Sequence, residues 1–286
     1  MKLHKIDKKP KLGVFLLTLQ SRLFVYYAGG VLVPLLAIPF LMVATHSQHI
    51  DETDPRLVAV SSVCMIIMAI ILLIIQRKRY AKEYRGCIAG ADGKLSLLLA
   101  LPFVLYWCVI LFLYISKDNF TYPNIFGILT SLGAGIGEET MYRIVPIGFA
   151  MRHRNNKGII PFTVLITTVY FGLSHAMNFF AGATVEMTVF QVLATTCIGA
   201  LLAAVYLRTG SGLLVMAVHS LNDIIASTDA AVGSALTYKI GLRTTDKIDF
   251  CCVLVMFVLA LILLRPSKHE DIRKRWDIKF NGAIAS

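Results

Sequence analysis

The sequence is poor in charged residues. Of its 286 residues only 16% are Asp, Glu, Lys or Arg, whereas a soluble domain carries about 25%. Hydrophobic residues make up 57% of the chain, and the mean hydropathy is +0.70. One globular core could not bury so much apolar surface, and several apolar runs reach the roughly 18 residues that span a bilayer. This composition excludes a soluble enzyme, a fibrous protein and a disordered protein.

Several familiar motifs are also missing. The glycine-rich stretch 133–137 is not followed by Gly-Lys-Ser/Thr, which excludes a phosphate-binding loop, and the H-E-x-x-H signature of zinc peptidases is absent. No internal repeat or Ser/Pro-rich linker is visible. No disulfide framework is predicted, because the cysteines show no C-x-x-C spacing and mostly lie in apolar runs. They are Cys64, Cys87, Cys108, Cys197, Cys251 and Cys252.

The apolar runs predict an all-α fold, a polytopic integral membrane bundle of about eight transmembrane helices. The segment Val14–Gln20 ahead of the first run is either an amphipathic interfacial helix or an extension of the first span. The expected spans are 23–44, 57–75, 96–115, 125–150, 158–180, 185–207, 211–228 and 248–264.

The net charge of +11 follows from the expected topology. With the N-terminus in the cytoplasm, 22 of the 28 Lys and Arg residues fall in inner segments and five in outer ones, and Arg143 lies inside a span. This asymmetry predicts two cytoplasmic termini and an even number of spans. A nucleic-acid partner is therefore not expected, and the basic start Met1–Lys11 leads into an uncleaved first span.

The fourth expected span carries Glu138, Glu139 and Arg143 near its middle. Charges inside a membrane span are costly unless they are paired or functional. Glu139 and Arg143 are four residues apart in the favourable ion-pair order, whereas Glu138 lies about 140° from Arg143 around the helix. We therefore expect Arg143 to neutralise Glu139 and Glu138 to face elsewhere. A purely structural ion pair would leave Glu138 unexplained.

Two later spans carry histidines. In the fifth, Phe171 lies one turn before His175 on the same face. In the seventh, His219 shares a face with Asn222 and Asp223. These polar groups need partners in the bundle interior. Small residues would let the helices approach closely, with G-x-x-x-G spacing in the fourth span. They are Gly133, Gly135, Gly137, Gly199, Ala200, Ala203 and Ala204.

Such a set of residues suits hydrolysis. A carboxylate and an imidazole, Glu138 and His175, can together take a proton from water. His219 with Asn222 or Asp223 can stabilise the oxyanion that forms on a scissile carbonyl. No cofactor is required, although Glu138, His175 and His219 are also acceptable zinc ligands. One difficulty is depth, because these three residues lie about 20, 26 and 15 Å from the inner helix ends.

Three motifs in order, Glu138-Glu139-x-x-x-Arg143, Phe171-x-x-x-His175 and His219-x-x-x-Asp223, resemble those of the CPBP (CAAX protease and bacteriocin-processing) family, also called Abi. The resemblance covers about 125–228. It implies an eight-helix intramembrane endopeptidase in which the first glutamate and the second motif's histidine activate water. The third motif's histidine and its Asn or Asp form the oxyanion site. Family members are often labelled metalloproteases, whereas the glutamate mechanism needs no metal.

The expected spans and the resemblance together divide the chain into four segments. These are a basic cytoplasmic segment at 1–22, the first three transmembrane helices at 23–124, a catalytic core at 125–228, and the last helix with a basic cytoplasmic tail at 229–286. It implies a hydrophobic or lipid-modified peptide substrate, because the site is reached through the bundle. Eukaryotic relatives cut after a prenylated cysteine, and bacterial relatives are linked to peptide maturation or bacteriocin immunity. The compact length favours a bacterial plasma-membrane protein.

Two other classes of function remain open from the sequence. A non-enzymatic immunity or scaffold protein would keep the ionic residues for structure alone. A proton-coupled transporter could also use intramembrane Glu and His side chains. The chain shows no repeated halves with paired broken helices, which weighs against a transporter.

Overall fold

The computed structural model describes residues 9–45, 54–79, 88–90, 92–180, 182–230 and 242–282. Across these residues the regular structure is helical, apart from one isolated bridge between Phe120 and Asp229. Cys87 and the first eight residues of the expected basic N-terminal segment lie outside the described residues. The five described cysteines are free thiols.

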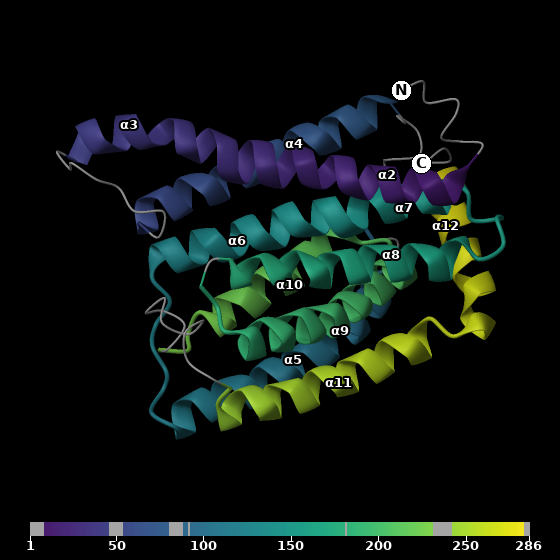
Figure 1. Cartoon of the computed structure of the whole chain (residues 1–286). Helices are drawn as coiled ribbons and strands as arrows, with labels where there is room; N and C mark the ends of the chain where they lie inside the picture. Colours follow the sequence, from purple (N-terminus) through teal and green to yellow (C-terminus); the bar gives the residue numbers. More distant parts are fainter. Residues whose placement is uncertain are drawn as a thin grey trace.

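The helices lie side by side and alternate in direction (Figure 1). Their bounds, in chain order, are α2 Pro10–Arg22, η1 Leu23–Leu32, α3 Val33–Thr45, α4 Pro55–Arg79, α5 Gly93–Ser116, α6 Ile125–Glu139, η3 Thr140–Ile144, α7 Val145–Arg152, α8 Ile159–Ser174, η4 His175–Phe179, α9 Val185–Thr209, α10 Gly212–Ala226, α11 Thr244–Leu263, η6 Pro266–Lys268 and α12 His269–Gly282. All eight expected spans are helical, so the predicted all-α polytopic bundle is confirmed.

Five helical stretches of the described chain are long and apolar enough to cross a membrane: 10–43, 55–79, 93–116, 159–179 and 185–209. The α11–α12 pair adds a sixth if it is counted as one span bent by 56°. Helix α10 has only 15 residues, about 22 Å of helix. The charged fourth segment is continuous from α6 through η3 to α7.

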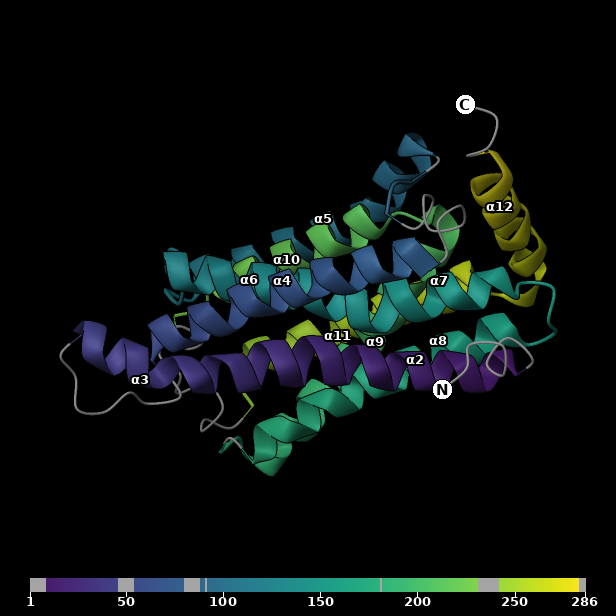
Figure 2. The ribbon, with the colours of Figure 1, turned by 90° about the horizontal axis from the view of Figure 1, so that it is seen from above.

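The segment Val14–Gln20 is continuous with the first expected span. Helix α2 runs directly into the π-helical segment η1 and then α3, without a break. The whole stretch is about 54 Å long at 1.5 Å per residue, well beyond the roughly 30 Å of a hydrocarbon core. Seen from above, α2, η1 and α3 run along the length of the bundle, while α12 crosses its end (Figure 2).

Capping residues fix where several helices begin. The side chains of Asp92, Asn124, Thr184 and Ser211 accept hydrogen bonds from backbone N–H groups in the first turns of α5, α6, α9 and α10. These bonds satisfy N–H groups that a helix start leaves unpaired. Helix α9 ends at Gly210 with a φ of 62°, a left-handed conformation that glycine adopts without strain.

Glycines let α6 pack closely between α4 and α10. A Cβ at Gly133 would lie 2.7 Å from Ser62 Cβ, and one at Gly137 would lie 2.9 Å from Met65 Cε, both on α4. A Cβ at Gly135 would lie 2.6 Å from the backbone N of Ser220 on α10. The close contacts expected from the small residues are therefore present, and they set α6 against the helix that carries His219.

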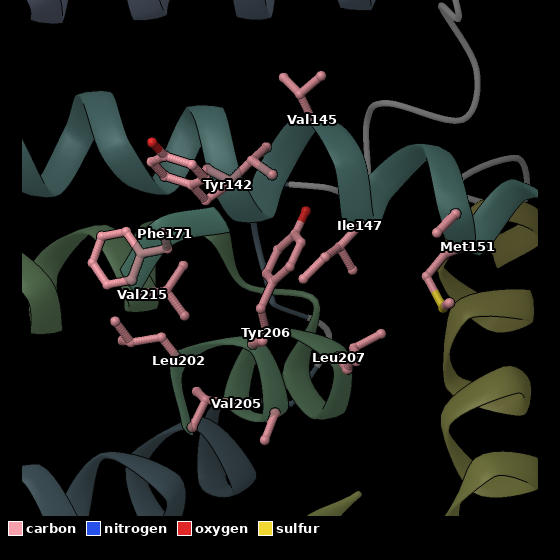
Figure 3. Packing of buried hydrophobic residues seen from close by; sticks show 14 of the residues in the cluster. Tyr142, Val145, Ile147, Met151, Phe171, Leu202, Val205, Tyr206, Leu207 and Val215 are labelled. Carbon is pink, nitrogen blue, oxygen red and sulfur yellow. The ribbon is translucent and has the colours of Figure 1, made fainter. Parts of the chain in front are cut away.

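The apolar core lies between α7, α8, α9 and α10. In Figure 3, Phe171 lies beside Tyr142 and the Tyr206 ring points toward Ile147. The Phe171 and Tyr142 ring centroids are 5.3 Å apart in an edge-to-face arrangement. Helix α12 closes one end of this core, where the indole of Trp276 is fully buried and donates a hydrogen bond to the Leu207 carbonyl oxygen.

We predict that Gly135→Ala lowers the free energy of unfolding by about 1–3 kcal/mol, because its methyl group would push α6 away from Ser220. The matched control is Gly93→Ala, at a helical position with open space around its Cβ, and it should leave stability unchanged or slightly raised. Thermal unfolding of both variants in detergent measures the difference. Equal stability of the two variants would contradict the close α6–α10 contact.

Candidate active site

A cavity of about 270 Å³ opens among the helices that carry the polar motifs. It brings together most of the residues that the sequence singled out, and the difference in depth expected for Glu138, His175 and His219 does not keep them apart. Residues from α2, η1, α6, η3, α8, η4, α9 and α10 line it. They are Arg22, Tyr26, Ala134, Glu138, Met141, Tyr142, Phe171, Ser174, His175, Asn178, Thr195, Ile198, His219, Asn222 and Asp223.

The fourth segment changes its winding just after the two glutamates. Residues Thr140–Ile144 form a π-helical turn, immediately before Pro146. A proline has no N–H to donate to the preceding turn, so the helix widens where that hydrogen bond is missing. The wider turn contains Arg143; just before it, Glu138 lines the cavity and Glu139 is fully buried.

Glu139 and Arg143 form the ion pair that their spacing predicts. Arg143 Nη1 donates to Glu139 Oε1 at 2.9 Å, and both side chains are fully buried. The Arg143 guanidinium also lies 4.1 Å from the centroid of the Phe171 ring. A close approach of Gly199 makes room for it, since a Cβ there would lie 2.8 Å from Arg143 Nη2. Neither side chain lines the cavity, so the pair acts on the site only through the residues that it contacts.

His219 lies between the buried pair and the cavity. Its Nδ1 is 2.7 Å from Glu139 Oε1, so the Nδ1–H donates to that carboxylate and fixes the ring orientation. Its Nε2 faces the cavity, 3.7 Å from Glu138 Oε2 and 3.5 Å from Asp223 Oδ2. The imidazole thus presents one nitrogen to any molecule in the cavity and keeps the other on Glu139.

His175 stands at the point where α8 ends and the short 3₁₀ turn η4 begins. Its Nδ1 is 3.1 Å from the Phe171 carbonyl oxygen, so the Nδ1–H donates to that oxygen and Nε2 is left for other contacts. The rings of Phe171 and His175 meet edge to face, with centroids 5.2 Å apart. Ser174 also lines the cavity, and its hydroxyl donates to the same carbonyl at 2.6 Å.

Asn222 is held by a residue from outside the three motifs. The indole Nε1–H of Trp107 on α5 donates to Asn222 Oδ1 at 3.3 Å. An indole N–H can only donate, so it must meet the amide oxygen, and the amide NH₂ of Asn222 is left to donate elsewhere. That group is 3.5 Å from Asp223 Oδ1, at the cavity wall.

Several cavity residues could not be singled out from the sequence. Arg22 counted only as one of the basic residues near the expected inner end, and Tyr26, Tyr142 and Asn178 carried no motif. Asn178 lies on η4 and donates to Gln191 Oε1 at 2.8 Å. The one signal that could have pointed to Trp107 is its indole N–H, a polar group inside an apolar span that needs a partner.

The residues do not fit a metal site. In the part of the chain that the structure describes, no three His, Cys, Asp or Glu side chains are grouped so that they could hold an ion. The zinc ligands considered from the sequence, Glu138, His175 and His219, line one cavity but do not converge on a common point.

A carboxylate and two imidazoles around a cavity inside apolar helices are groups that an intramembrane hydrolase requires. Residues 120–225 match the family model described as "Type II CAAX prenyl endopeptidase Rce1-like". The match spans just over a third of the chain and includes all three motifs. The three motifs thus lie in a segment that is similar to CAAX-type intramembrane proteases of the CPBP family, and the chain is a multi-pass membrane protein. No curated protein and no solved structure gave a significant match.

We predict that Arg143→Met lowers the free energy of unfolding by about 3 kcal/mol, because it leaves a buried carboxylate without its cation. Adding Glu139→Gln should recover much of that loss, since the amide oxygen can still accept from His219 Nδ1 while the unpaired charge is removed. A double-mutant cycle on unfolding in detergent measures the coupling.

The control for this cycle is the ion pair between Asp54 and Arg56. These side chains are 2.6 Å apart, but Arg56 is 44% exposed. Solvent screens such a pair, so Asp54→Asn and Arg56→Met should show no measurable coupling. A coupling of Glu139 with Arg143 that is no larger than this control would contradict the role of the buried pair.

Proposed function

We propose that the protein is an endopeptidase that hydrolyses a peptide bond of a hydrophobic or prenylated peptide inside the membrane. The observation that carries the proposal is the meeting of Glu138, His175 and His219 at one cavity, within the segment that matches the CAAX endopeptidase model. A carboxylate and two imidazoles from separate helices supply the proton acceptor and the hydrogen-bond donor that hydrolysis needs.

In the proposed reaction a water molecule in the cavity lies within reach of Glu138 and His175. Glu138 takes one proton from the water, with His175 Nε2 as its partner, while the water oxygen bonds to the carbonyl carbon of the peptide. The tetrahedral intermediate then loses its amine as the C–N bond breaks. The proton taken from water passes to the leaving nitrogen, so that one water is consumed and the products are a carboxylic acid and an amine.

His219 and Asn222 are the proposed oxyanion donors. Nε2 of His219 faces the cavity, and it donates to the oxyanion when the ring carries a proton on both nitrogens. The amide NH₂ of Asn222 is the second donor, because Trp107 occupies the amide oxygen. Asp223 then orients His219 from the cavity side. On the other side Glu139, paired with Arg143, accepts from His219 Nδ1 and fixes the ring. Such donors lower the barrier by about 3 kcal/mol each.

The proposed setting is a bacterial plasma membrane with both termini in the cytoplasm. Support comes from the end of the bundle where α12 crosses, because α2 begins there and α7 and α9 end there (Figure 2). Basic side chains gather at this end: Arg154 pairs with Asp277, and Arg208 pairs with Asp271 at 2.7 Å. An excess of Lys and Arg marks the cytoplasmic side.

We predict that Glu138→Gln and His175→Ala each reduce peptide cleavage at least about 100-fold, because each removes one of the two groups that activate water. The purified protein in lipid nanodiscs is incubated with a farnesylated peptide, and the products are measured by mass spectrometry. Glu186→Gln is the matched control, since Glu186 lies exposed in the first turn of α9, and it should cleave normally.

Unchanged cleavage in both variants would contradict the proposed roles. A non-enzymatic immunity or scaffold protein gives a different pattern, in which no peptide is cleaved and Glu138→Gln keeps its protective effect in cells. A transporter would instead move a substrate into proteoliposomes without cleaving it.

A second prediction uses the two tryptophans of the chain. Trp107→Phe removes the indole N–H that fixes the Asn222 amide, so the amide can turn its oxygen toward the oxyanion. We expect kcat to fall about tenfold, the loss of one hydrogen bond of roughly 1 kcal/mol or more, with little change in melting temperature.

Trp276→Phe is the matched control for this change. It also removes an indole hydrogen bond, the one to the Leu207 carbonyl, but at the α12 end of the bundle. It should lower the melting temperature and leave kcat unchanged. The role of Trp107 is wrong if both substitutions affect kcat alike.

A further inference from the structure

One acidic side chain of the last expected span has no part in the function proposed above. Asp249 lies near the start of α11, just before the apolar run that ends at Leu263. Its carboxylate accepts a hydrogen bond from the phenol of Tyr106 on α5, with 2.6 Å between Tyr106 Oη and Asp249 Oδ1. An ionisable residue inside a span is costly unless it is paired or functional. Both residues lie outside 120–225, the segment that matches the CAAX endopeptidase model.

Tyr106 is the chain neighbour of Trp107, whose indole N–H donates to the amide oxygen of Asn222. Helix α5 contacts both α10 and α11, and it runs beside α11 along one edge of the bundle (Figure 1). Adjacent residues of a helix point about 100° apart, so Tyr106 can reach α11 while Trp107 reaches α10. A rotation of α5 that moves one ring moves the other by the same angle. The bond from Tyr106 to Asp249 therefore also sets where the indole N–H points.

Helix α11 is itself held against the helix that carries Asn222. Arg243, directly before α11, donates from Nη1 and Nη2 to the two carboxylate oxygens of Asp229, at 3.1 and 2.6 Å. Asp229 is fully buried and follows closely after the end of α10. The amide of Asn119, just after α5, donates to the same carboxylate. An arginine fork on a carboxylate fixes geometry as well as charge, so the outer ends of α5, α10 and α11 are held together.

These contacts form a closed ring through three helices. From Asn222 the ring runs along α10 to Asp229 and Arg243, and then along α11 to Asp249. It crosses to α5 through the Tyr106 phenol and returns to Asn222 through the Trp107 indole. The indole and the amide that it contacts therefore lie in one set of mutually braced helices.

We propose that Asp249, through Tyr106, positions the Trp107 indole that aims the Asn222 amide at the oxyanion. Asp249 touches no reacting atom and acts by fixing the rotation of α5. A small misplacement of a reacting group lowers the rate even when the altered residue lies far from it. The proposal rests on the endopeptidase function argued above, and it adds to the reaction two helices from outside the matched segment.

The first test observes the indole directly. The chain has two tryptophans, so protein in which only tryptophan carries the NMR-active nitrogen isotope gives two indole N–H signals, and Trp107→Phe identifies them. In nanodiscs, Tyr106→Phe and Asp249→Leu should move the Trp107 signal and speed its exchange in heavy water at least about threefold. The Trp276 signal should stay in place. Asp249→Asn keeps an oxygen that accepts from Tyr106, so both signals should stay near their wild-type positions.

The second test follows cleavage of the farnesylated peptide. We expect Tyr106→Phe and Asp249→Leu to lower kcat about fivefold and to change KM less than about twofold, because the oxyanion forms only after the peptide has bound. In a Trp107→Phe background neither substitution should lower kcat further, since the indole N–H through which both act is already gone. A purely structural role would lower the melting temperature and add its effect on kcat to that of Trp107→Phe.

Asp277→Leu is the matched control. The Asp277 carboxylate also bonds across the bundle, accepting from Arg154 Nε at 2.6 Å, but it lies beside Trp276 on α12. This variant should leave kcat and the Trp107 signal unchanged. The proposal is overturned if Tyr106→Phe and Asp249→Leu leave the Trp107 signal in place, if Asp249→Asn moves it as far as Asp249→Leu does, or if their effects on kcat add to that of Trp107→Phe.

The indole signal separates this proposal from the protease function, because it requires no cleavage. If no peptide is cleaved but Tyr106→Phe and Asp249→Leu still move the Trp107 signal, the protease function fails and the positioning of the indole stands. If the wild type cleaves the peptide but the signal does not respond, the positioning fails and the protease function stands.

Discussion

The site depends on the buried ion pair between the Arg143 guanidinium and the Glu139 carboxylate. The guanidinium neutralises Glu139, which allows a second glutamate to remain in the same helix, and Glu139 in turn holds the Nδ1 of His219. Three helical segments, α6, η3 and α10, are thereby tied together at the depth where Glu138 faces the cavity. An unpaired charge at any of these positions would be too costly inside the bundle.

The packing of small residues makes this network possible. Gly135 brings α6 against the backbone of Ser220, next to His219, and Gly199 leaves space for Arg143 beside the Phe171 ring. The π-helical turn before Pro146 then changes which way the side chains after Glu139 point. The polar site is therefore a product of close packing, because short distances between the helix backbones bring the polar side chains of α6, η3 and α10 together beside the cavity.

The sequence predicted what depends on local patterns. Apolar runs predicted eight helical spans that the structure contains, and the four-residue spacing of Glu139 and Arg143 predicted their ion pair. Contacts between distant helices could not be predicted, because no local rule states that His219 meets Glu139 or that Trp107 meets Asn222. Arg22 was counted with the cytoplasmic charges, since the helix that carries it is longer than the membrane is thick and the sequence gives no depth. The catalytic roles of these residues stay predictions.

The most direct test of the account is an experimental structure of Glu138→Gln in a lipid nanodisc with an uncleaved farnesylated peptide bound. The account predicts that the scissile carbonyl lies in the cavity, with its carbon facing residue 138 and His175 and its oxygen facing His219 and Asn222. A peptide bound with its scissile carbonyl outside this cavity, or with that oxygen turned away from His219 and Asn222, would contradict it.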